Sequence, residues 1–365
     1  MKQNINKTLP AGSIIGVLGG GQLGRMTALA AAPLGYRCHI FTPEHNSPAA
    51  QVAAMVTVAS YEDSEALTNF ANNVDIITYE FENIPLSSVT LLERLKIMRP
   101  SSSILAISQH RGDEKGFAIK HGITVAPYKI VTNIEELHNA IKIIGIPSVL
   151  KTCRFGYDGK GQFVINKPED VDRAWHLLES DDLVLEKFIT YTKEISVIVA
   201  RDINGNCKTY SPGENQHLEH ILDTTVVPAN ISAATSEAAK SIALKLAESM
   251  NLIGLLAVEM FVMADGTLMM NEIAPRPHNS GHWTQDGAHT SQFEQFVRAI
   301  TGQPLSDTKI ISSTIMKNLI GTAVNQLPDF FNNPNAKIHL YGKTEIRPGR
   351  KMGHVNILKT KSAKY

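Results

Sequence analysis

Two glutamates interrupt apolar segments near the middle of the chain. Glu259 stands in "LLAVEMFVM" (255–263), and Glu272 stands in "TLMMNEI" (267–273). A charge inside an apolar strand is costly unless it is paired or bound to a metal. If the two segments pair as a hairpin, both carboxylates can share one face and offer hard oxygen ligands to magnesium. The alternative is a pair of solvent-facing glutamates at a sheet edge.

Two glycine-rich stretches could bind phosphate. "GGGQLG" (19–24) has the form G-x-G-x-x-G between a predicted strand and a predicted helix, and Glu44 follows at the distance typical of a dinucleotide site. Its amides could equally hold another phosphate at a helix N-terminus, or the stretch could be a tight turn. "FGYDGKGQ" (155–162) lies between two predicted strands and lacks the Walker pattern. Its amides, with Lys151 and Lys160, could clamp a triphosphate, whereas a flexible surface hairpin is the alternative.

A polar loop follows the second glutamate. In "NEIAPRPHNSGHWTQDG" (271–287), two prolines stiffen a segment that is typical of the wall of a site. Arg276 could bind a carboxylate or phosphate with its guanidinium, and Asn279 and Ser280 could orient a small oxyanion. A single histidine here would more often be structural. "RPGRKMGH" (347–354) adds Arg350 and Lys351 near the end of the chain.

The strands and helices that must position these residues alternate in the first part of the sequence, and a different arrangement is predicted after it. Strands are predicted at 13–18, 36–42, 52–58 and 74–79, with a helix at 22–32, which indicates a parallel sheet covered by helices. A long helix is expected from "PSSS" (100–103) to His121. Beyond it we expect a mixed antiparallel region with helices at 235–250 and 291–301, and short strands near 315–322, 337–341 and 353–358.

Composition narrows the class of protein. With 365 residues, more than one domain is expected, and 35 basic residues balance 35 acidic ones, so no global field attracts nucleic acid or a membrane. The cysteines at 38, 153 and 207 are odd in number and widely spaced, which predicts neither a disulfide framework nor a structural zinc site. No targeting or spanning segment is visible in the sequence, and a cytoplasmic location is expected.

The set of motifs and their order resemble a known family. "GGGQLGRM", "TYEFENIP", "FGYDGKGQ", "NEIAPRPHNSGHWT" and "RPGRKMGH" are together similar to the 5-(carboxyamino)imidazole ribonucleotide synthases, which are purine-biosynthetic members of the ATP-grasp superfamily. The likeness runs from Ile15 to the C-terminus. It implies an α/β and α+β fold with a Rossmann-like N-terminal domain (1–105), a central ATP-grasp domain with a mobile flap near 155–162 (106–305) and a small β-rich C-terminal domain (306–365).

The resemblance also implies a reaction. ATP and magnesium would drive ligation of bicarbonate to the exocyclic amine of 5-aminoimidazole ribonucleotide through carboxyphosphate, releasing ADP and phosphate. A homodimer is implied, and since no fused carboxylase domain is present, a single activity is expected. Residues 1–12 extend beyond the family pattern.

The resemblance assigns residues to each ligand. Glu259 and Glu272 match the metal ligands. The positions that match the ATP site are Arg111, Lys151, Gly156, Tyr157, Asp158, Gly159, Lys160, Gly161, Gln162, Glu186, Lys187, Phe188, Ile189, Glu194, His217, Asn271 and Glu272. Those carried over for the ribonucleotide are Gly21, Gln22, Leu23, Glu80, Tyr157, Lys160, Arg350 and Lys351. Catalysis is assigned to Tyr157, Lys160, Arg276, His278, Asn279 and Lys351, with Arg276, His278 and Asn279 on the bicarbonate side.

Other functions remain open on the residues alone. An NAD-dependent dehydrogenase would use "GGGQLG" and Glu44 but would give no role to Glu259, Glu272 or the 155–162 loop. A regulatory nucleotide-binding protein would keep the loops and lack the carboxylates. A ligase that acts on another carboxylate, or on formyl phosphate, is the nearer alternative.

Overall fold

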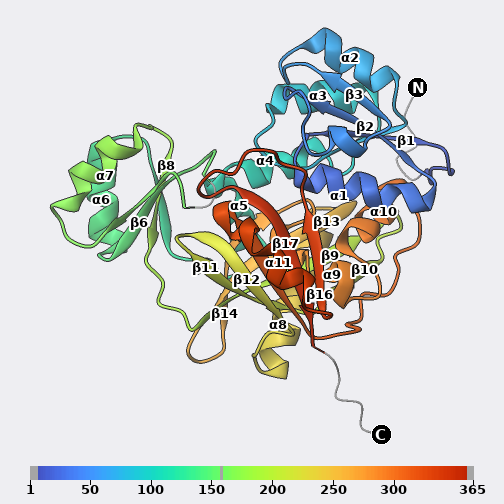
Figure 1. The fold of residues 1–365 in the computed structure, drawn as a ribbon. Coiled ribbons are helices and arrows are strands. Elements are labelled where there is room, and N and C mark those ends of the chain that lie inside the picture. Colours follow the sequence, from blue (N-terminus) through green and yellow to red (C-terminus); the bar gives the residue numbers. More distant parts are fainter. Residues whose placement is uncertain (1–6, 157–158, 360–365) are drawn as a thin grey trace, which may run out of the picture.

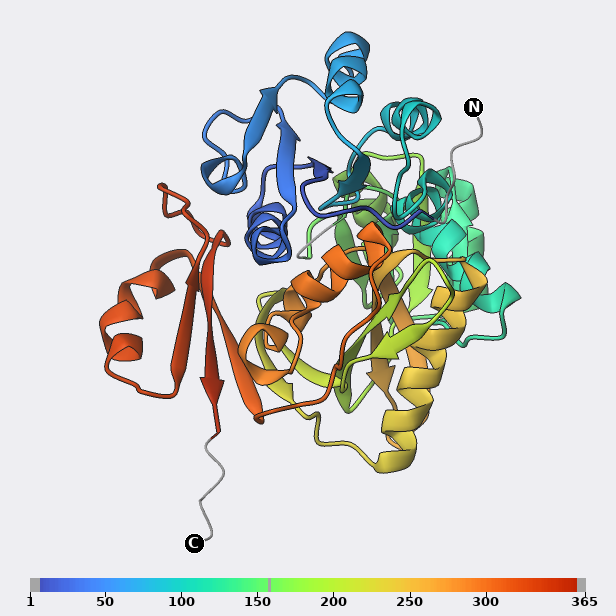
Figure 2. The same ribbon diagram turned by 90° about the vertical axis from the view of Figure 1, so that its right-hand side faces the viewer.

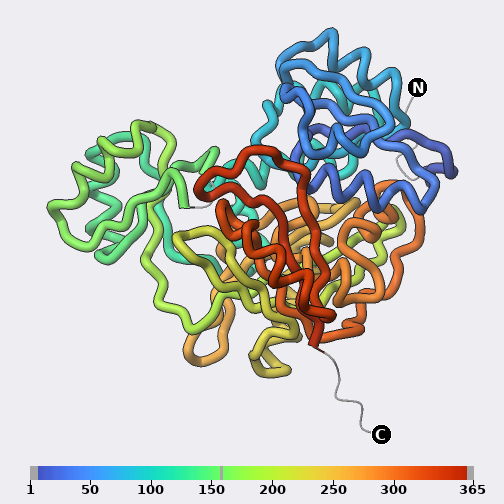
Figure 3. The backbone as a smooth tube through the Cα atoms, viewed as in Figure 1, coloured from blue at the N-terminus to red at the C-terminus, as the bar shows by residue number. Residues whose placement is uncertain are grey.

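Three β-sheets organise the chain. A computed structural model describes residues 7–156 and 159–359, and Figures 1 and 3 trace the path of the chain through them. The N-terminal region, a smaller α+β lobe and a large antiparallel sheet follow one another in sequence. None of the helices in the described ranges is long and apolar enough to cross a membrane.

The N-terminal region is a parallel sheet with helices, as the alternating pattern predicts. Its strands are β1 (Ile14–Leu18), β2 (Arg37–Thr42), β3 (Met55–Val58) and β4 (Ile76–Tyr79), in the spatial order β3-β2-β1-β4. The helices are α1 (Gln22–Ala31), α2 (Ser64–Asn72) and α3 (Leu86–Leu95). The strand expected at 52–58 begins only at Met55, because Ala50–Val52 forms a 3-10 turn.

The long helix expected from "PSSS" to His121 is wrong, because the structure has two helices. α4 (Ser102–Gln109) and α5 (Arg111–Lys120) are separated by His110, which has an extended backbone with φ −128° and ψ 115°. Nδ1 of His110 accepts a hydrogen bond of 3.2 Å from the Asp113 N–H and so caps α5. The break places Arg111 in the first turn of α5.

The smaller lobe is an antiparallel sheet packed against two helices. It contains β5 (Tyr128–Val131), β6 (Ser148–Thr152), β7 (Gln162–Ile165) and β8 (Leu183–Lys187), in the order β5-β8-β6-β7, with α6 (Ile134–Ile144) and α7 (Asp170–Leu178). It projects from the left of the molecule in Figure 1. Lys151 of β6 pairs with Gln162 of β7, so "FGYDGKGQ" does connect two hairpin strands as predicted.

The large sheet contains nine strands and includes the C-terminal ones. Its order is β14-β13-β9-β11-β12-β15-β17-β16, and β10 pairs with β9. The bounds are β9 (Lys193–Arg201), β10 (Cys207–Thr209), β11 (Gly213–Leu218), β12 (Ile221–Val227), β13 (Gly254–Val262), β14 (Leu268–Ala274), β15 (Thr314–Ile320), β16 (Ala336–Leu340) and β17 (Lys351–Leu358). β15 pairs with β12, so the C-terminal strands extend this sheet along one side of the molecule (Figure 2).

Helices on both faces bury the centre of the large sheet. α8 (Ala233–Ser249) packs on the face that carries Val197 and Val199, and α10 (Gln292–Thr301) packs on the face that carries Ile198 and Ala200. Because side chains alternate along a strand, both faces of β9 are apolar at its centre, which explains the continuous apolar run "VIVA" (197–200). Shorter helical segments are Ala32–Leu34, Asn279–Gly281, Thr284–Gly287 (α9), Gly321–Gln326 and Leu327–Phe331 (α11).

Candidate active site

Two adjoining cavities lie between the N-terminal region, the smaller lobe and the large sheet. The first has a volume of about 310 Å³ and the second about 390 Å³. The first is bordered by Gln22 of α1 and by Glu80, which follows β4 directly. The second is bordered by Lys151 of β6 and Glu186 of β8. The residues that line both are Arg111, Glu259, Glu272, His278, Asn279 and Lys351. All six are predicted site residues, so the structure brings this part of the predicted site together at one junction.

The predicted metal carboxylates face each other at this junction. Glu259 of β13 and Glu272 of β14 are direct partners in the strand register, which shifts immediately after Glu259. Burial and the negative charge of Glu272 raise the pKa of Glu259. Burial alone would also raise the pKa of Glu272, but Arg111, whose Nη1 lies 3.1 Å from Oε2, lowers it. Although β14 is an edge strand, both carboxylates line the cavity walls, where the side chain of Glu259 is 15% exposed and that of Glu272 is 40% exposed.

The carboxylate pair fits a divalent cation. Two hard oxygen groups on facing strands are the ligands that magnesium prefers. As bare charges they repel each other, which is expressed in the raised pKa of Glu259. A cation shared between Glu259 and Glu272 would remove this repulsion, and it would lie where the two cavities meet.

The second cavity combines an apolar end with a cationic one. Val149, Val164, Phe188, Ile189 and Leu222 supply apolar walls, as a flat heterocycle requires. The ring of Tyr191 also lines this cavity and stacks on Phe261 with centroids 4.5 Å apart. The remaining predicted nucleotide residues on its wall are Lys151, Gly159, Lys160, Gln162, Glu186, Lys187, Glu194, His217 and Asn271.

Glu186 holds two lysines at the back of this cavity. Lys151 Nζ lies 3.0 Å from Oε2 of Glu186, and Lys115 Nζ lies 3.3 Å from Oε1. Burial favours the neutral acid, but the two lysines outweigh it and lower the pKa of Glu186 to about 2. Farther along the wall, Nδ1 of His217 lies 2.6 Å from Glu194. Burial alone would lower the pKa of His217, yet the bond to Glu194 raises it.

The loop between β6 and β7 requires glycine at particular positions. Gly159 and Gly161 have φ of +76° and +70°, and a Cβ on Gly161 would lie 2.6 Å from Oγ1 of Thr152. Gly156 lines the first cavity, and Gly159, Lys160 and Gln162 line the second, whereas Gly161 is not among the described lining residues. Tyr157 and Asp158 lie outside the described residues.

In the first cavity, the amides of "GGGQLG" already bind an internal carboxylate. The N–H groups of Gly21 and Gly24 donate to the two carboxylate oxygens of Glu80. Burial raises the pKa of Glu80, while these two bonds oppose the shift. A Cβ on Gly19 would lie 2.3 Å from Cγ of Glu80, so one reason for glycine here is the close approach of Glu80. Gln22 and Leu23 line the cavity, whereas the Gly21 N–H is bound to Glu80, so phosphate anchoring by that amide stays a prediction that would require Glu80 to release it.

The polar loop after β14 presents groups with unused hydrogen-bonding capacity. Arg276 Nη2 lies 2.8 Å from Oε2 of Glu82, which fixes the guanidinium at the cavity wall. Both side-chain polar atoms of Asn279 are buried and have no hydrogen-bond partner among the described residues. Nδ1 of His278 lies 2.9 Å from the Ser280 hydroxyl, and burial lowers the pKa of His278 well below its ordinary value. A neutral imidazole and an unsatisfied amide suit a small oxyanion such as bicarbonate.

Arg350 and Lys351, the two residues of "RPGRKMGH" that the family resemblance assigns to the site, differ in position. Lys351 lines both cavities. Arg350 is not among the described lining residues, and its Nη1 donates a 3.0 Å hydrogen bond to the Glu345 carbonyl. Lys343, which was not predicted, reaches the same region, because its Nζ donates to the Gln22 side chain at 2.9 Å and to the Lys351 carbonyl at 2.8 Å.

Several further functional residues were missed by the sequence reasoning. Glu82, which holds Arg276, lies inside the quoted motif "TYEFENIP" and could have been found there. Glu114 and Lys115 are buried on α5, where one accepts the Ile273 N–H beside Glu272 and the other binds Glu186. Their only sequence signal is a pair of charges in a helix that also carries Arg111.

Comparisons with known families cover most of the chain. Residues 13–109 match the ribonucleotide synthetase preATP-grasp domain, residues 116–293 match the ATP-grasp domain, and residues 314–365 match the phosphoribosylaminoimidazole carboxylase C-terminal domain.

Individual relatives are similar over their full length. N5-carboxyaminoimidazole ribonucleotide synthase of Bacillus subtilis is 44% identical over 95% of this chain and 92% of the relative, and that of Brucella melitensis is 44% identical over 97% and 99%. Among solved structures, an ADP complex of N5-carboxyaminoimidazole ribonucleotide synthetase has a TM-score of 0.94 and 45% identity, covering 97% of this chain and 94% of the other. The enzyme of Aspergillus clavatus with ADP and 5-aminoimidazole ribonucleotide has a TM-score of 0.90 and 31% identity, covering 96% and 94%.

Proposed function

The chain belongs to the N5-carboxyaminoimidazole ribonucleotide synthase family, and on that premise we propose that it uses ATP to carboxylate 5-aminoimidazole ribonucleotide with bicarbonate. The product is N5-carboxyaminoimidazole ribonucleotide, formed with ADP and phosphate in purine biosynthesis. The observation that carries the proposal is the junction of two cavities at Glu259 and Glu272. One cavity suits a nucleotide and the other suits a polar ribonucleotide, so a phosphoryl group and an amine can meet at the shared wall.

The proposed reaction has two steps. A bicarbonate oxygen attacks the γ-phosphorus of ATP, the bond to the bridging oxygen breaks, and carboxyphosphate and ADP form. The exocyclic amine then attacks the carboxyl carbon, either in carboxyphosphate or in carbon dioxide released from it, and phosphate leaves as the amine loses a proton. Catalysis would rest on electrostatic stabilisation of the transferring phosphoryl group, on exclusion of water and on proximity of the amine to the short-lived intermediate.

The second cavity is assigned to ATP. Its apolar walls would hold the adenine, while Lys151 and Lys160 would hold the phosphates as fixed positive charges. Arg111 lines both cavities and would contact the transferring phosphoryl group. We assign Tyr157 and Asp158 to the same loop by family resemblance alone. Magnesium, held by Glu259 and Glu272, would neutralise charge on the triphosphate.

The first cavity is assigned to the ribonucleotide and bicarbonate. Arg276, fixed by Glu82, and the unsatisfied amide of Asn279 would bind the bicarbonate oxygens. Nδ1 of His278 accepts the Ser280 N–H, so the neutral ring carries its proton on Nε2, 3.7 Å from Oε1 of Glu259, and would donate that N–H to a bicarbonate oxygen. Lys351 and Gln22 border the space left for the ribonucleotide, and Lys351 is placed to meet an anionic group.

The proposal extends to properties beyond the reaction. We assign the chain to a homodimer in the cytoplasm, with three domains divided near 105 and 305 and a mobile flap near 155–162. These assignments rest on the family resemblance. The boundary near 305 does not separate two β-sheets, because β15 pairs with β12 and the C-terminal strands continue the sheet of the preceding domain.

A coupled assay tests the function. ADP release should require both bicarbonate and 5-aminoimidazole ribonucleotide, and labelled bicarbonate should appear in the ribonucleotide with one ADP formed for each carboxyl group transferred. ADP release that ignores either substrate would contradict the proposal. A titration with NADH, followed by its fluorescence, should show no binding. The pairing of the Gly21 and Gly24 amides with Glu80 disfavours the dehydrogenase alternative, because a pyrophosphate would need those amides.

A further inference from the structure

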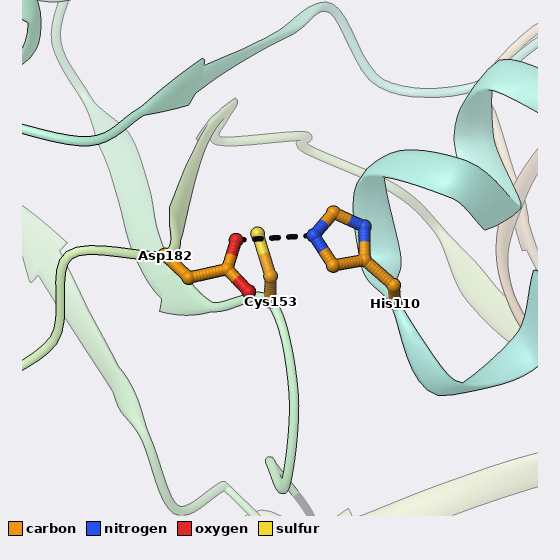
Figure 4. A group of neighbouring side chains, drawn as sticks. All are labelled: His110, Cys153 and Asp182. Carbon is orange, nitrogen blue, oxygen red and sulfur yellow. Dashed lines mark hydrogen bonds and ion pairs between the residues drawn. The ribbon is translucent and has the colours of Figure 1, made fainter. Parts of the chain in front are cut away.

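A cysteine, a histidine and an aspartate lie close together where the break between α4 and α5 contacts the smaller lobe. Figure 4 shows His110, from the break between α4 and α5, pointing toward Cys153 and Asp182. Cys153 follows β6, and Asp182 precedes β8. One ligand atom from each lies within 4.8 Å of the other two, and Nε2 of His110 is 3.0 Å from Oδ1 of Asp182. The proposed reaction assigns no role to these three side chains.

We propose that these side chains form a binding site for a thiophilic divalent cation of the zinc class, with Cys153 Sγ, His110 Nε2 and an Asp182 carboxylate oxygen as ligands. One sulfur, one nitrogen and one oxygen donor form a set that zinc accepts and magnesium does not favour. Three protein ligands leave the fourth tetrahedral position to water. Cys153 lines the first cavity, which supplies an entry path and that water.

The surroundings of the histidine provide an outer partner. When Nε2 binds a metal, the ring proton must reside on Nδ1, and it then needs an acceptor. Oδ2 of Asp113 lies 3.6 Å from Nδ1 and can take that role after a small movement. The cap that Nδ1 now provides to the Asp113 N–H would be lost, which limits affinity. Arg154, with Nε 3.8 Å from Oδ2 of Asp182, is a further opposing charge, but its half-exposed side chain can turn away.

The site connects three segments that carry nucleotide residues. Arg111 follows His110 directly, and its backbone N–H donates to the Cys153 carbonyl at 3.0 Å. The Cys153 N–H donates to the Asp182 carbonyl at 2.9 Å, so the backbone already links β6 to the start of β8. A bound cation would therefore tie the start of α5, the base of the 155–162 loop and β8 to one another.

Cobalt is the probe for a test on the full chain, because a thiolate bound to Co²⁺ produces a charge-transfer band in the near ultraviolet. The metal-free protein should develop this band with one equivalent of Co²⁺. Zinc should displace the cobalt, and a large excess of Mg²⁺ should not. Absence of the band at saturating Co²⁺, or its removal by Mg²⁺, would overturn the proposal.

Matched variants locate the site. Cys153→Ala should abolish the band, and Cys153→Ser should do the same while filling the buried volume better. Asp182→Asn and His110→Asn should weaken cobalt binding at least about tenfold, and the asparagine at 110 keeps an acceptor for the cap on α5. Cys207→Ala and Cys38→Ala remove the other free cysteines and should leave the band unchanged. Circular dichroism confirms folding of each variant, and a band that survives Cys153→Ala and Cys153→Ser contradicts the assignment.

Discussion

Lys115 Nζ lies 3.3 Å from Oε1 of Glu186, and both side chains are buried. The other oxygen of Glu186 receives Lys151 at 3.0 Å, and Lys115 also donates to the Asn271 carbonyl at 3.3 Å. Lys115 belongs to α5, Glu186 to β8 and Asn271 to β14. This one lysine therefore links the smaller lobe to the strand that carries Glu272, behind the second cavity, which both Glu186 and Asn271 line.

Lys115→Met should lower both stability and ATP affinity. Glu186 keeps Lys151 as a cationic partner, but it loses one of its two lysines and the Asn271 carbonyl loses a donor, and a buried polar group that loses a partner costs about 1–3 kcal/mol. Urea unfolding should detect this loss, and the KM for ATP should rise because Glu186 and Asn271 lose a common anchor. Lys240→Met is the matched control: Lys240 pairs with the exposed Glu237 on α8, and its loss should change stability by less than about 0.5 kcal/mol. Equal effects of the two substitutions would contradict this role.

The sequence supports prediction where a pattern is local. The N-terminal alternation predicts the parallel sheet, and the paired apolar segments predict that Glu259 and Glu272 face each other. The break at His110 has only a weak signal in "SSILAISQHRGDEKGFAIK", where Gly112 lowers helix propensity and Asp113 and Glu114 are typical of a first turn, and the cap on Asp113 is visible only in the structure.

Contacts between residues that are distant in sequence could not be predicted from local patterns. Lys115 contacts Glu186 across many intervening residues, and Arg276 contacts Glu82 in the same manner. Neither contact has a spacing that a single sequence reveals. The pairing of Glu80 with the glycine loop also depends on tertiary structure, since "GGGQLG" by itself predicts an external anion as readily as an internal carboxylate.

Lys343 should make the free energy of unfolding vary with pH in the alkaline range. Burial and the nearby Arg350 lower the pKa of Lys343 from 10.5 to about 8. Between pH 8 and 10.5 the unfolded chain therefore holds more protons than the folded chain, and the contribution of this lysine to stability increases as the pH rises. The free energy of unfolding of the wild type, minus that of Lys343→Met, should therefore increase by roughly 1–2 kcal/mol as the pH rises through that window. Urea unfolding at pH 8 and pH 10 measures it, and a difference that shrinks with pH would contradict the lowered pKa.

Lys351 should matter more than Arg350 for the ribonucleotide. Lys351→Ala removes a cation from the wall of both cavities and should raise the KM for 5-aminoimidazole ribonucleotide by at least about tenfold, as loss of a charge-assisted contact does. Arg350→Ala removes a side chain that contacts the Glu345 carbonyl and should have a smaller effect. Steady-state kinetics with ATP saturating separates the two. A larger effect at Arg350 would place that guanidinium in the substrate site when the ribonucleotide binds.

Glu259→Gln and Glu272→Gln test the chemistry at the junction of the cavities. If both carboxylates bind the magnesium that accompanies ATP, the loss of either leaves triphosphate charge poorly compensated as the phosphoryl group moves. Turnover should fall roughly a hundredfold or more, equivalent to about 3 kcal/mol. Folding should survive, because an amide of the same shape removes the repulsion within the pair, although Glu272→Gln also gives up the 3.1 Å contact with Arg111. Thermal unfolding without nucleotide provides that control. ADP formation is measured with bicarbonate and ribonucleotide across a magnesium series, and near-normal rates in both variants at limiting magnesium would remove these residues from the metal site.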